Sequence, residues 1–348
     1  MQKIQFQCDY NEGAHPLIMQ RLMETNMEQT VGYGEDPHCQ RARELIREAC
    51  QAPKEDVHFL VGGTQANTTV ISHLLRPYQG VIAADTGHIN VHETGAIEAT
   101  GHKVLALPNV DGKISAAQID ATMKRHYAED GPEHMVQPGM VYLSFPTEVG
   151  TIYSLSELQA IREVCDRYTL SLFVDGARLG YGLCSPMCDV TLPQLAALAD
   201  VFYIGGTKVG ALFGEAVVIV NEGLKRDFRY SIKRHGGMLA KGRLLGIQFE
   251  TLFTDGLYFR IARHAVSQAL RIKQVLQAKG FQMLVDSPTN QQFVLLTQEQ
   301  CDAFSRSFVF ENEGKTEDGM HISRFCTSWG TSDEETEALI EAIIELKK

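Results

Sequence analysis

The chain has 348 residues, of which 44% are hydrophobic and 22% charged, a composition typical of globular proteins and unlike disordered or repeat sequences. Its formal net charge is −11 and it has no long basic run, which argues against a nucleic acid or an anionic membrane as its partner. No stretch approaches the roughly 18 apolar residues of a membrane span, and no apolar signal segment opens the chain. Eight cysteines are scattered, and the closest two, Cys184 and Cys188, lack a second pair to complete a zinc site. We therefore expect a cytoplasmic protein with free thiols and no metal.

From about residue 57, short apolar runs alternate with helix-like segments. This alternation predicts βαβ units on a largely parallel sheet, with binding loops at the carboxyl ends of the strands. One such helix covers residues 154–170 and is capped by Ser154 or Ser156, whereas the polar segment 127–139 is expected to be a surface loop. The expected strands are VHFLVGG, GVIAAD, GHKVLALP, MVYLSFP, LSLFVDG, VFYIGG and EAVVIVN.

The pattern changes after about residue 240. A long helical stretch, interrupted near Asp255-Gly256, is followed by two strand-like runs, QQFVLLT and HISRFCTSW, and by a last helix with Ser332 as its N-cap. We predict a large domain over residues 1–240, whose N-terminal segment joins a subunit interface, and a small domain over residues 241–348.

Three features lie at the carboxyl ends of predicted strands. Asp175 ends one strand, and Lys208 follows the next strand after a crossover helix, so that both meet at one edge of the sheet. This pair suits pyridoxal 5′-phosphate, which needs a lysine as its covalent partner and an acid against its pyridine nitrogen. Gly63, Thr64 and Gln65 follow a strand and open a helix, where backbone N–H groups can hold a phosphate. Each feature alone could be an ion pair or a turn, but together they reinforce one another.

The sequence resembles the threonine aldolase and aromatic amino acid β-eliminating lyase family of fold-type I pyridoxal-phosphate enzymes. That resemblance implies an α/β fold, with a mostly parallel seven-stranded sheet in the large domain and a small C-terminal α+β domain. It also implies a homo-oligomer, a dimer or tetramer, with the active site at the subunit interface. The residues that carry it are QCDYNEGAHP, YGEDP (33–37), GGTQAN (62–67), GHINVHETGA (87–96), DGARLG (175–180), GGTKVGALFGE (205–215) and RFCTSW.

The resemblance further implies roles for individual residues. Lys208, Asp175 and His88 would be catalytic and would hold the cofactor, with His88 stacked on its ring. Arg178 and Arg324 match two arginines that grip the carboxylate of an amino-acid substrate, and Arg178 would also help to hold the cofactor. A guanidinium suits this task because it recognises a carboxylate through two parallel hydrogen bonds.

The resemblance relates two further segments to a subunit interface. YGEDP would contribute to the active site at the subunit interface. The basic run 233–235 resembles a segment that carries a phosphate-binding arginine of the neighbouring subunit, and a solvated basic face is an equal alternative.

The sequence departs from the family at several positions. Threonine aldolases commonly carry a second active-site histidine after a threonine, whereas Glu148 follows Thr147 here. This difference leaves the physiological substrate open. Cys8 takes a position that is often serine, near the expected carboxylate site, and Val209 follows the lysine where a small or polar residue is more common. Cys8, Glu148 and His15 are further candidates for substrate contacts.

The leading hypothesis is cleavage of a β-hydroxy-α-amino acid into glycine and an aldehyde. The base that takes the hydroxyl proton could be His88, Glu148, His15 or a water, and Glu93 could orient a catalytic group. The alternative is β-elimination from a β-substituted or aromatic amino acid, in which Lys208 removes the Cα proton. A protein that binds the cofactor without catalysis is a remote third hypothesis, which the retained lysine, aspartate and arginines oppose.

Overall fold

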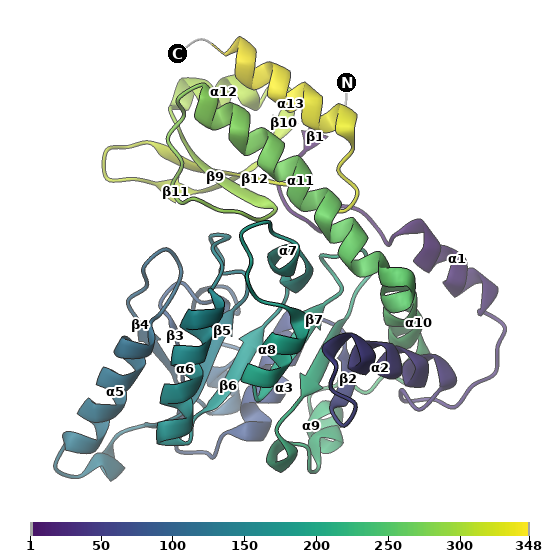
Figure 1. Cartoon of the computed structure of the whole chain (residues 1–348), viewed down its shortest axis with the longest axis vertical. Helices are drawn as coiled ribbons and strands as arrows, with labels where there is room; N and C mark the ends of the chain where they lie inside the picture. The colour runs from purple at the N-terminus through teal and green to yellow at the C-terminus, as the bar shows by residue number, and fades with distance from the viewer. Residues whose placement is uncertain (1–2, 347–348) are drawn as a thin grey trace.

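A seven-stranded sheet forms the centre of the larger half of the computed structural model, which describes residues 3–346 (Figure 1). Its strand order is β2-β8-β7-β6-β5-β3-β4, and only β8 runs antiparallel to its neighbours. This sheet confirms the predicted fold class, and each strand overlaps a predicted run, although β2, β3 and β5 begin before theirs. The strands are β2 (Asp56–Leu60), β3 (Gln79–Ala84), β4 (Val104–Leu107), β5 (Gln137–Ser144), β6 (Ser171–Asp175), β7 (Val201–Gly205) and β8 (Glu215–Ile219).

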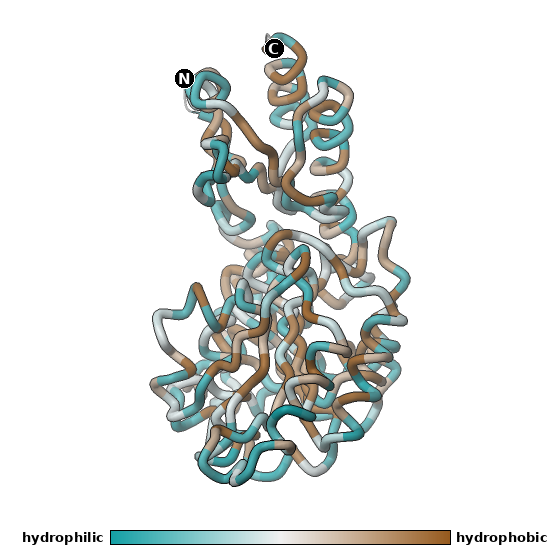
Figure 2. Tube along the Cα trace, turned by 90° about the vertical axis from the view of Figure 1, so that its left-hand side faces the viewer, coloured by the Kyte–Doolittle hydropathy of each residue, from teal (hydrophilic) through white to brown (hydrophobic). Residues whose placement is uncertain are grey.

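Helices cover both faces of the sheet. Successive side chains of β5 show why: Val141 and Leu143 enter one apolar core and Met140 and Tyr142 the other, because side chains alternate along a strand. With both faces buried, the strands are continuous apolar runs, and Figure 2 shows apolar residues concentrated inside the larger half. The helices are α5 (Ala116–Ala128), α6 (Leu155–Tyr168) and α8 (Leu192–Leu198) on one face, and α3 (Gly63–Leu74) and α9 (Phe228–Arg234) on the other.

Helix boundaries follow the predicted capping signals. Ser154 caps α6, and its hydroxyl accepts from the N–H of Glu157, whose side chain accepts from the backbone N–H of Ser154 in return. The long helical stretch divides into α10 (Arg243–Phe253) and α11 (Leu257–Ala278). Between them Asp255 and Gly256 take φ values of 51° and 65°, which end the first helix where the sequence predicts an interruption.

Helix α10 packs on α2 (Pro37–Cys50) and so belongs to the larger half, although it follows the predicted boundary at residue 240. The close approach needs a glycine, since a Cβ on Gly246 would lie 2.5 Å from the backbone nitrogen of Cys39.

The smaller half is an antiparallel sheet in the order β11-β12-β9, covered by helices (Figure 1). Its last helix is capped by Ser332, as predicted. The segment around residues 4–6 is built into this half, because β1 (Ile4–Gln5) pairs with β10 (Phe308–Val309) and Phe6 lies in its apolar core. The other elements are β9 (Gln291–Leu296), α12 (Gln298–Phe304), β11 (Glu311–Lys315), β12 (His321–Cys326) and α13 (Asp333–Glu345), and α1 (Pro16–Glu24) links the halves. Within residues 3–346, no helix is long and apolar enough to span a membrane.

Candidate active site

A cavity of about 350 Å³ opens at the carboxyl ends of β5, β6 and β7. It lies where parallel strands deliver binding loops in α/β folds. Tyr10, Thr207 and Glu215, for which the sequence predicts no role, also line it. The predicted site residues that line it are Gly63, Thr64, His88, Glu148, Asp175, Arg178 and Lys208.

Asp175 ends β6 and is almost completely buried. Its Oδ2 accepts hydrogen bonds from the Tyr142 hydroxyl at 2.5 Å and from Asn67 Nδ2 at 3.2 Å, and its Oδ1 accepts from the Ala177 N–H at 3.0 Å. Three donors therefore fix the carboxylate at the floor of the cavity. Tyr142 and Asn67 were not predicted, because nothing in the local sequence relates them to Asp175.

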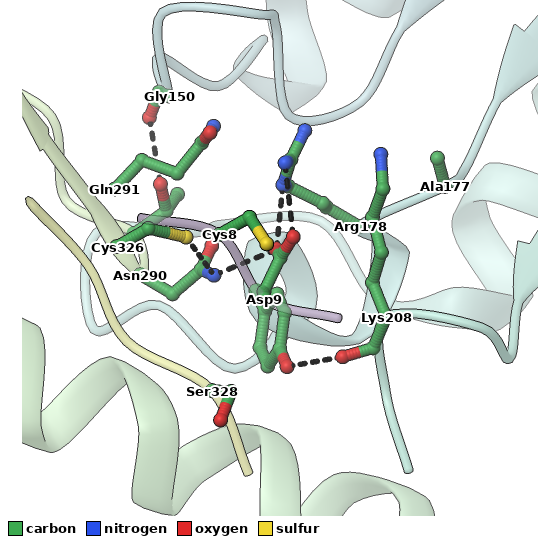
Figure 3. A network of polar contacts seen from close by, with 12 residues as sticks. Cys8, Asp9, Gly150, Ala177, Arg178, Lys208, Asn290, Gln291, Cys326 and Ser328 are labelled. Carbon is green, nitrogen blue, oxygen red and sulfur yellow. Dashed lines mark hydrogen bonds and ion pairs between the residues drawn. The ribbon is translucent and has the colours of Figure 1, made fainter. Parts of the chain in front are cut away.

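Lys208 lies in the turn after β7, and the Tyr181 hydroxyl of α7 (Leu179–Leu183) donates to its carbonyl oxygen at 2.5 Å. Burial and the nearby Arg178 guanidinium lower the pKa of the Lys208 amine, although carboxylates around it oppose this shift. A lowered pKa increases the fraction of neutral amine, which is the nucleophilic form. Figure 3 shows the side chains of Lys208 and Arg178 ending in the same region.

The glycine turn between β2 and α3 forms another wall of the cavity. Gly62 is the N-cap of α3 without a capping side chain, and a Cβ on Gly63 would lie 3.2 Å from the Tyr203 hydroxyl. Gln65 is oriented differently: its Oε1 accepts from the Val61 N–H at 3.1 Å and its Nε2 donates to a backbone carbonyl at 3.0 Å. The turn therefore presents the N-terminus of a helix to the cavity, and the Gln65 side chain supports the turn without lining the cavity.

His88 begins the short helix α4 (His88–Val91), and its Nδ1 lies 2.7 Å from Glu93 Oε1. The same oxygen accepts from Asn67 Nδ2 at 2.7 Å. Asn67 thus joins the carboxylates of Glu93 and Asp175, and Glu93 orients the His88 ring.

Glu148 lies in the loop after β5. Its Oε1 accepts from the backbone N–H of His88 at 2.8 Å and from Ser144 Oγ at 2.5 Å. Burial raises the pKa of the Glu148 carboxyl despite these donors. A carboxyl whose pKa is shifted toward neutrality suits proton transfer.

Arg178 forms a two-pronged ion pair with Asp9, through Nε–Oδ2 at 2.7 Å and Nη2–Oδ1 at 3.0 Å (Figure 3). Asn290 Nδ2 donates to Asp9 Oδ2 at 3.0 Å. Burial alone would raise the pKa of Asp9, but Arg178 and Lys208 outweigh it and hold that pKa below its ordinary value. The pair thus joins the N-terminal segment, the end of β6 and the smaller half beside the cavity.

Arg324 and Cys8 do not line the cavity. Arg324 Nη1 lies 2.8 Å from Glu313 Oε1 across the β11–β12 hairpin, and its Nη2 donates to the carbonyl oxygen of Gln7 at 3.1 Å. Cys8 is buried, which raises the pKa of its thiol, and its Sγ donates to Asn11 Oδ1 at 3.0 Å.

His15 lies outside the cavity lining too. It caps α1 by accepting from the Leu17 N–H at 3.3 Å, with its ring 5.5 Å from that of Trp329. Burial lowers the pKa of the His15 imidazole.

The two segments that the family resemblance relates to a subunit interface contact each other. Arg229 Nη1 lies 2.6 Å from Glu35 Oε1, and the Lys233 ammonium lies 5.2 Å from the centre of the Tyr33 ring. The YGEDP segment and α9 therefore form one continuous surface.

The chemistry of the cavity fits pyridoxal phosphate. An amine with a lowered pKa, a buried carboxylate and the N-terminus of a helix face one space, and these are the groups that such a cofactor needs. Lys208 would hold it covalently, Asp175 would face its pyridine nitrogen, and the turn 62–64 would receive its phosphate.

Comparisons with known proteins identify the family of this chain. The sequence pattern of the beta-eliminating lyase family matches residues 6–298. The low specificity L-threonine aldolase of Pseudomonas aeruginosa is 31% identical over 347 residues, which cover 97% of this chain and 96% of that protein. A solved structure of threonine aldolase from Leishmania major has a TM-score of 0.95 and 44% identity, with 98% of each chain covered.

A more distant structure shows the fold alone. Serine palmitoyltransferase from Sphingomonas wittichii is 14% identical, with a TM-score of 0.73 over 98% of this chain and 86% of that one. The resemblance inferred from the sequence motifs is confirmed: the chain belongs to the beta-eliminating lyase family and has the α/β fold type I of pyridoxal-phosphate enzymes.

Proposed function

We propose that this chain binds pyridoxal phosphate and cleaves a β-hydroxy-α-amino acid into glycine and an aldehyde. The observation that carries the proposal is the placement of Lys208, with its lowered pKa, and Asp175 in one cavity. Threonine aldolases that align over nearly the whole chain support cleavage of the carbon–carbon bond. When bound, the cofactor supplies an electron sink for the electron pair released at Cα.

The residues that line the cavity have separate roles in the proposed reaction. Asp175, fixed by three donors, keeps the pyridine nitrogen protonated. Lys208 would hold the cofactor through its neutral amine and would later carry a proton. His88, whose ring Glu93 orients, would pack against the cofactor.

Glu148 is the base that we favour for the β-hydroxyl proton. It lines the cavity and its pKa is raised by burial, whereas His15 caps α1 outside the lining. Ser144 and the His88 N–H orient the carboxylate oxygen.

The substrate carboxylate would bind to arginine. Asp9 accepts hydrogen bonds from Nε and Nη2 of Arg178. The third guanidinium nitrogen of Arg178, Nη1, is therefore available to a substrate in the cavity. Arg324 would take part only after exchanging its contact with Glu313 for the substrate.

Absorbance and product assays test the proposal. We expect the purified protein with pyridoxal phosphate to absorb visible light through its covalent link, and Lys208→Ala to abolish both that band and activity. Lys241→Ala, on the exposed surface, is the matched control and should change neither. Release of glycine and an aldehyde supports the aldolase, whereas pyruvate and ammonia from β-substituted amino acids would favour β-elimination. A colourless protein that cofactor cannot reconstitute would contradict both.

We also propose that the chain forms a homo-oligomer. Apolar side chains are exposed in the stretch that precedes the YGEDP segment, with Met23 77% and Met27 86% accessible in the isolated chain. Light scattering after size-exclusion chromatography tests this, and a monomer at micromolar concentration would contradict it. The cytoplasmic location expected from the sequence stays a prediction.

A further inference from the structure

Glu215 lies between the glycine turn and the reactive lysine. It is the first residue of β8, and the sheet register pairs it with Leu60 at the end of β2 and with Gly205 at the end of β7. The turn 62–64 follows β2 and Lys208 follows β7, so Glu215 lies beside the strand ends that lead to both. Glu215 lines the cavity and is only 3% exposed.

The hydrogen bonds of Glu215 are incomplete. Its Oε1 accepts from Thr207 Oγ1 at 2.9 Å, and that hydroxyl in turn accepts from the Gly214 N–H at 3.0 Å. Its Oε2 is buried and has no hydrogen-bond partner among residues 3–346. A carboxylate with an unpartnered buried oxygen is costly, whereas a carboxylic acid carries a proton there that can be donated to a ligand.

The surroundings of Glu215 favour the protonated form of its carboxyl group. Burial raises its pKa to about 8, and the carboxylate of Asp175 adds to this effect. Thr207 and Lys208 oppose the shift. The other titratable neighbours are the hydroxyls of Tyr203 and Tyr258, both uncharged at neutral pH because burial raises their pKa values.

We propose that Glu215 is a positioning residue that donates a hydrogen bond from Oε2, as a carboxylic acid, to the phosphate of the cofactor at the turn 62–64. This inference rests on the proposed function, because it requires pyridoxal phosphate in the cavity. Loss of the proton would remove a donor and place a negative charge beside the phosphate. Cofactor affinity would then fall as the pH rises through the pKa of Glu215.

The experiment compares pyridoxal phosphate with pyridoxal, which has no phosphate. Dissociation constants of both are measured between pH 7.5 and 9.5, where a phosphate ester with a second pKa of about 6 no longer titrates. Protonation of Lys208 affects both ligands equally, so the ratio of the two constants isolates the phosphate. We expect the preference for pyridoxal phosphate to fall by about tenfold or more across this range in the wild type, and to stay constant in Glu215→Gln.

Glu148→Gln is the matched control, because Glu148 is another buried carboxyl of this cavity with a raised pKa. The preference of the Glu148→Gln variant for pyridoxal phosphate over pyridoxal should fall with rising pH as in the wild type. Circular dichroism of each variant checks its fold. Should Glu215→Gln fail to fold, Thr207→Val gives a second test: it removes a donor that lowers the pKa of Glu215, so the fall should move to higher pH.

The outcomes are distinct. An equal fall for pyridoxal would mean that the titrating group acts on a part that both ligands share and not on the phosphate, which overturns the inference. A constant preference in the wild type overturns it as well. If both ligands bind but the pH dependence of the preference for pyridoxal phosphate is the same in the wild type and in Glu215→Gln, the inference fails and the proposed function stands. If neither ligand binds, both fail.

Discussion

The ion pair between Asp9 and Arg178 shows how single residues assemble this site. Asp9 is completely buried, and its two oxygens hold Arg178 and Asn290, which come from distant parts of the chain. Because the charges are buried, removal of one partner leaves the other uncompensated.

We therefore expect Asp9→Ala to destabilise the protein by about 3–5 kcal/mol, measured by urea unfolding. The double variant Asp9→Leu/Arg178→Met removes both charges and should recover a large part of this loss. The fold lowers the pKa of Asp9. The ion pair therefore contributes its full stabilisation of the folded protein at pH values above about 3.9, the pKa of an aspartate in the unfolded chain. This stabilisation is lost as the pH falls through the lower pKa that Asp9 has in the folded protein. A loss below 1 kcal/mol for the single variant would contradict this account.

The sequence predicts the site only in part, for physical reasons. Asp175 and Lys208 could be found because strand ends and motifs mark them. Asp9 and Glu215 lie inside motifs that carry the family resemblance, yet their roles depend on pairings between distant segments. Asn290 has no local signal, since its partner precedes it by 281 residues.

At the level of elements, periodicity and caps predicted the large sheet and six helices, namely α3, α6, α8, α10, α11 and α13, whereas no helix was predicted at α2 or α5. They missed β1 and β10, which have two residues each, and β11, whose sequence ENEGK has no apolar alternation. Such strands depend on a neighbouring strand, and no pattern of their own marks them.

The end of α6 offers a local test. Thr169 is its C-cap, with φ of 56°, a left-handed conformation that is unfavourable for a β-branched residue. It is exposed, so little packing is lost on replacement. Thr169→Gly should raise the free energy of unfolding by about 1 kcal/mol. Thermal unfolding measures the change. A lower melting temperature for Thr169→Gly would show that the Thr169 side chain stabilises the fold by more than its left-handed backbone conformation destabilises it.

His38 joins three elements and gives a pH-dependent prediction. Its ring nitrogens lie 2.7 Å from Glu250 Oε2 on α10 and 2.8 Å from Glu28 Oε2 in the loop after α1. Burial lowers the pKa of His38, but the two carboxylates outweigh it and raise that pKa. The contribution of protonated His38 to the stability of the fold is therefore complete below about pH 6.5, the pKa of a histidine in the unfolded chain. It is lost as the pH rises through the higher pKa that His38 has in the folded protein. The difference in melting temperature between wild type and His38→Ala should shrink from pH 6 to pH 9, and a constant difference would refute this.

Across the whole molecule, the two halves meet beside the cavity. Gly150 accepts hydrogen bonds from Ser287 Oγ at 3.1 Å and Thr289 Oγ1 at 3.2 Å, and Gln291 Nε2 donates to the carbonyl oxygen of Glu148 at 3.3 Å. The loop that carries Glu148 is therefore held by the smaller half.

Gly150→Ala tests this contact. A Cβ there would lie 2.4 Å from Ser287 Oγ, and φ is 81°. Gly101→Ala is the matched control, with φ of 94° and nothing within 4 Å of its Cβ. Both variants should lose about 1 kcal/mol of stability from the left-handed backbone. Only Gly150→Ala should also lower kcat/KM, and equal activity of the two variants would show that docking of the halves does not shape the site.

The pairing of β1 with β10 also affects the order in which the chain can fold during synthesis. Gln7 contacts Glu311, 304 residues later, so the first strand has no partner until nearly the whole chain has left the ribosome. The large sheet can form earlier, because its strands lie between residues 56 and 219. Asp9 follows β1 by only four residues and can reach Arg178 in its final arrangement only then. The ion pair between Asp9 and Arg178 therefore forms late, after translation of the segment that carries β10.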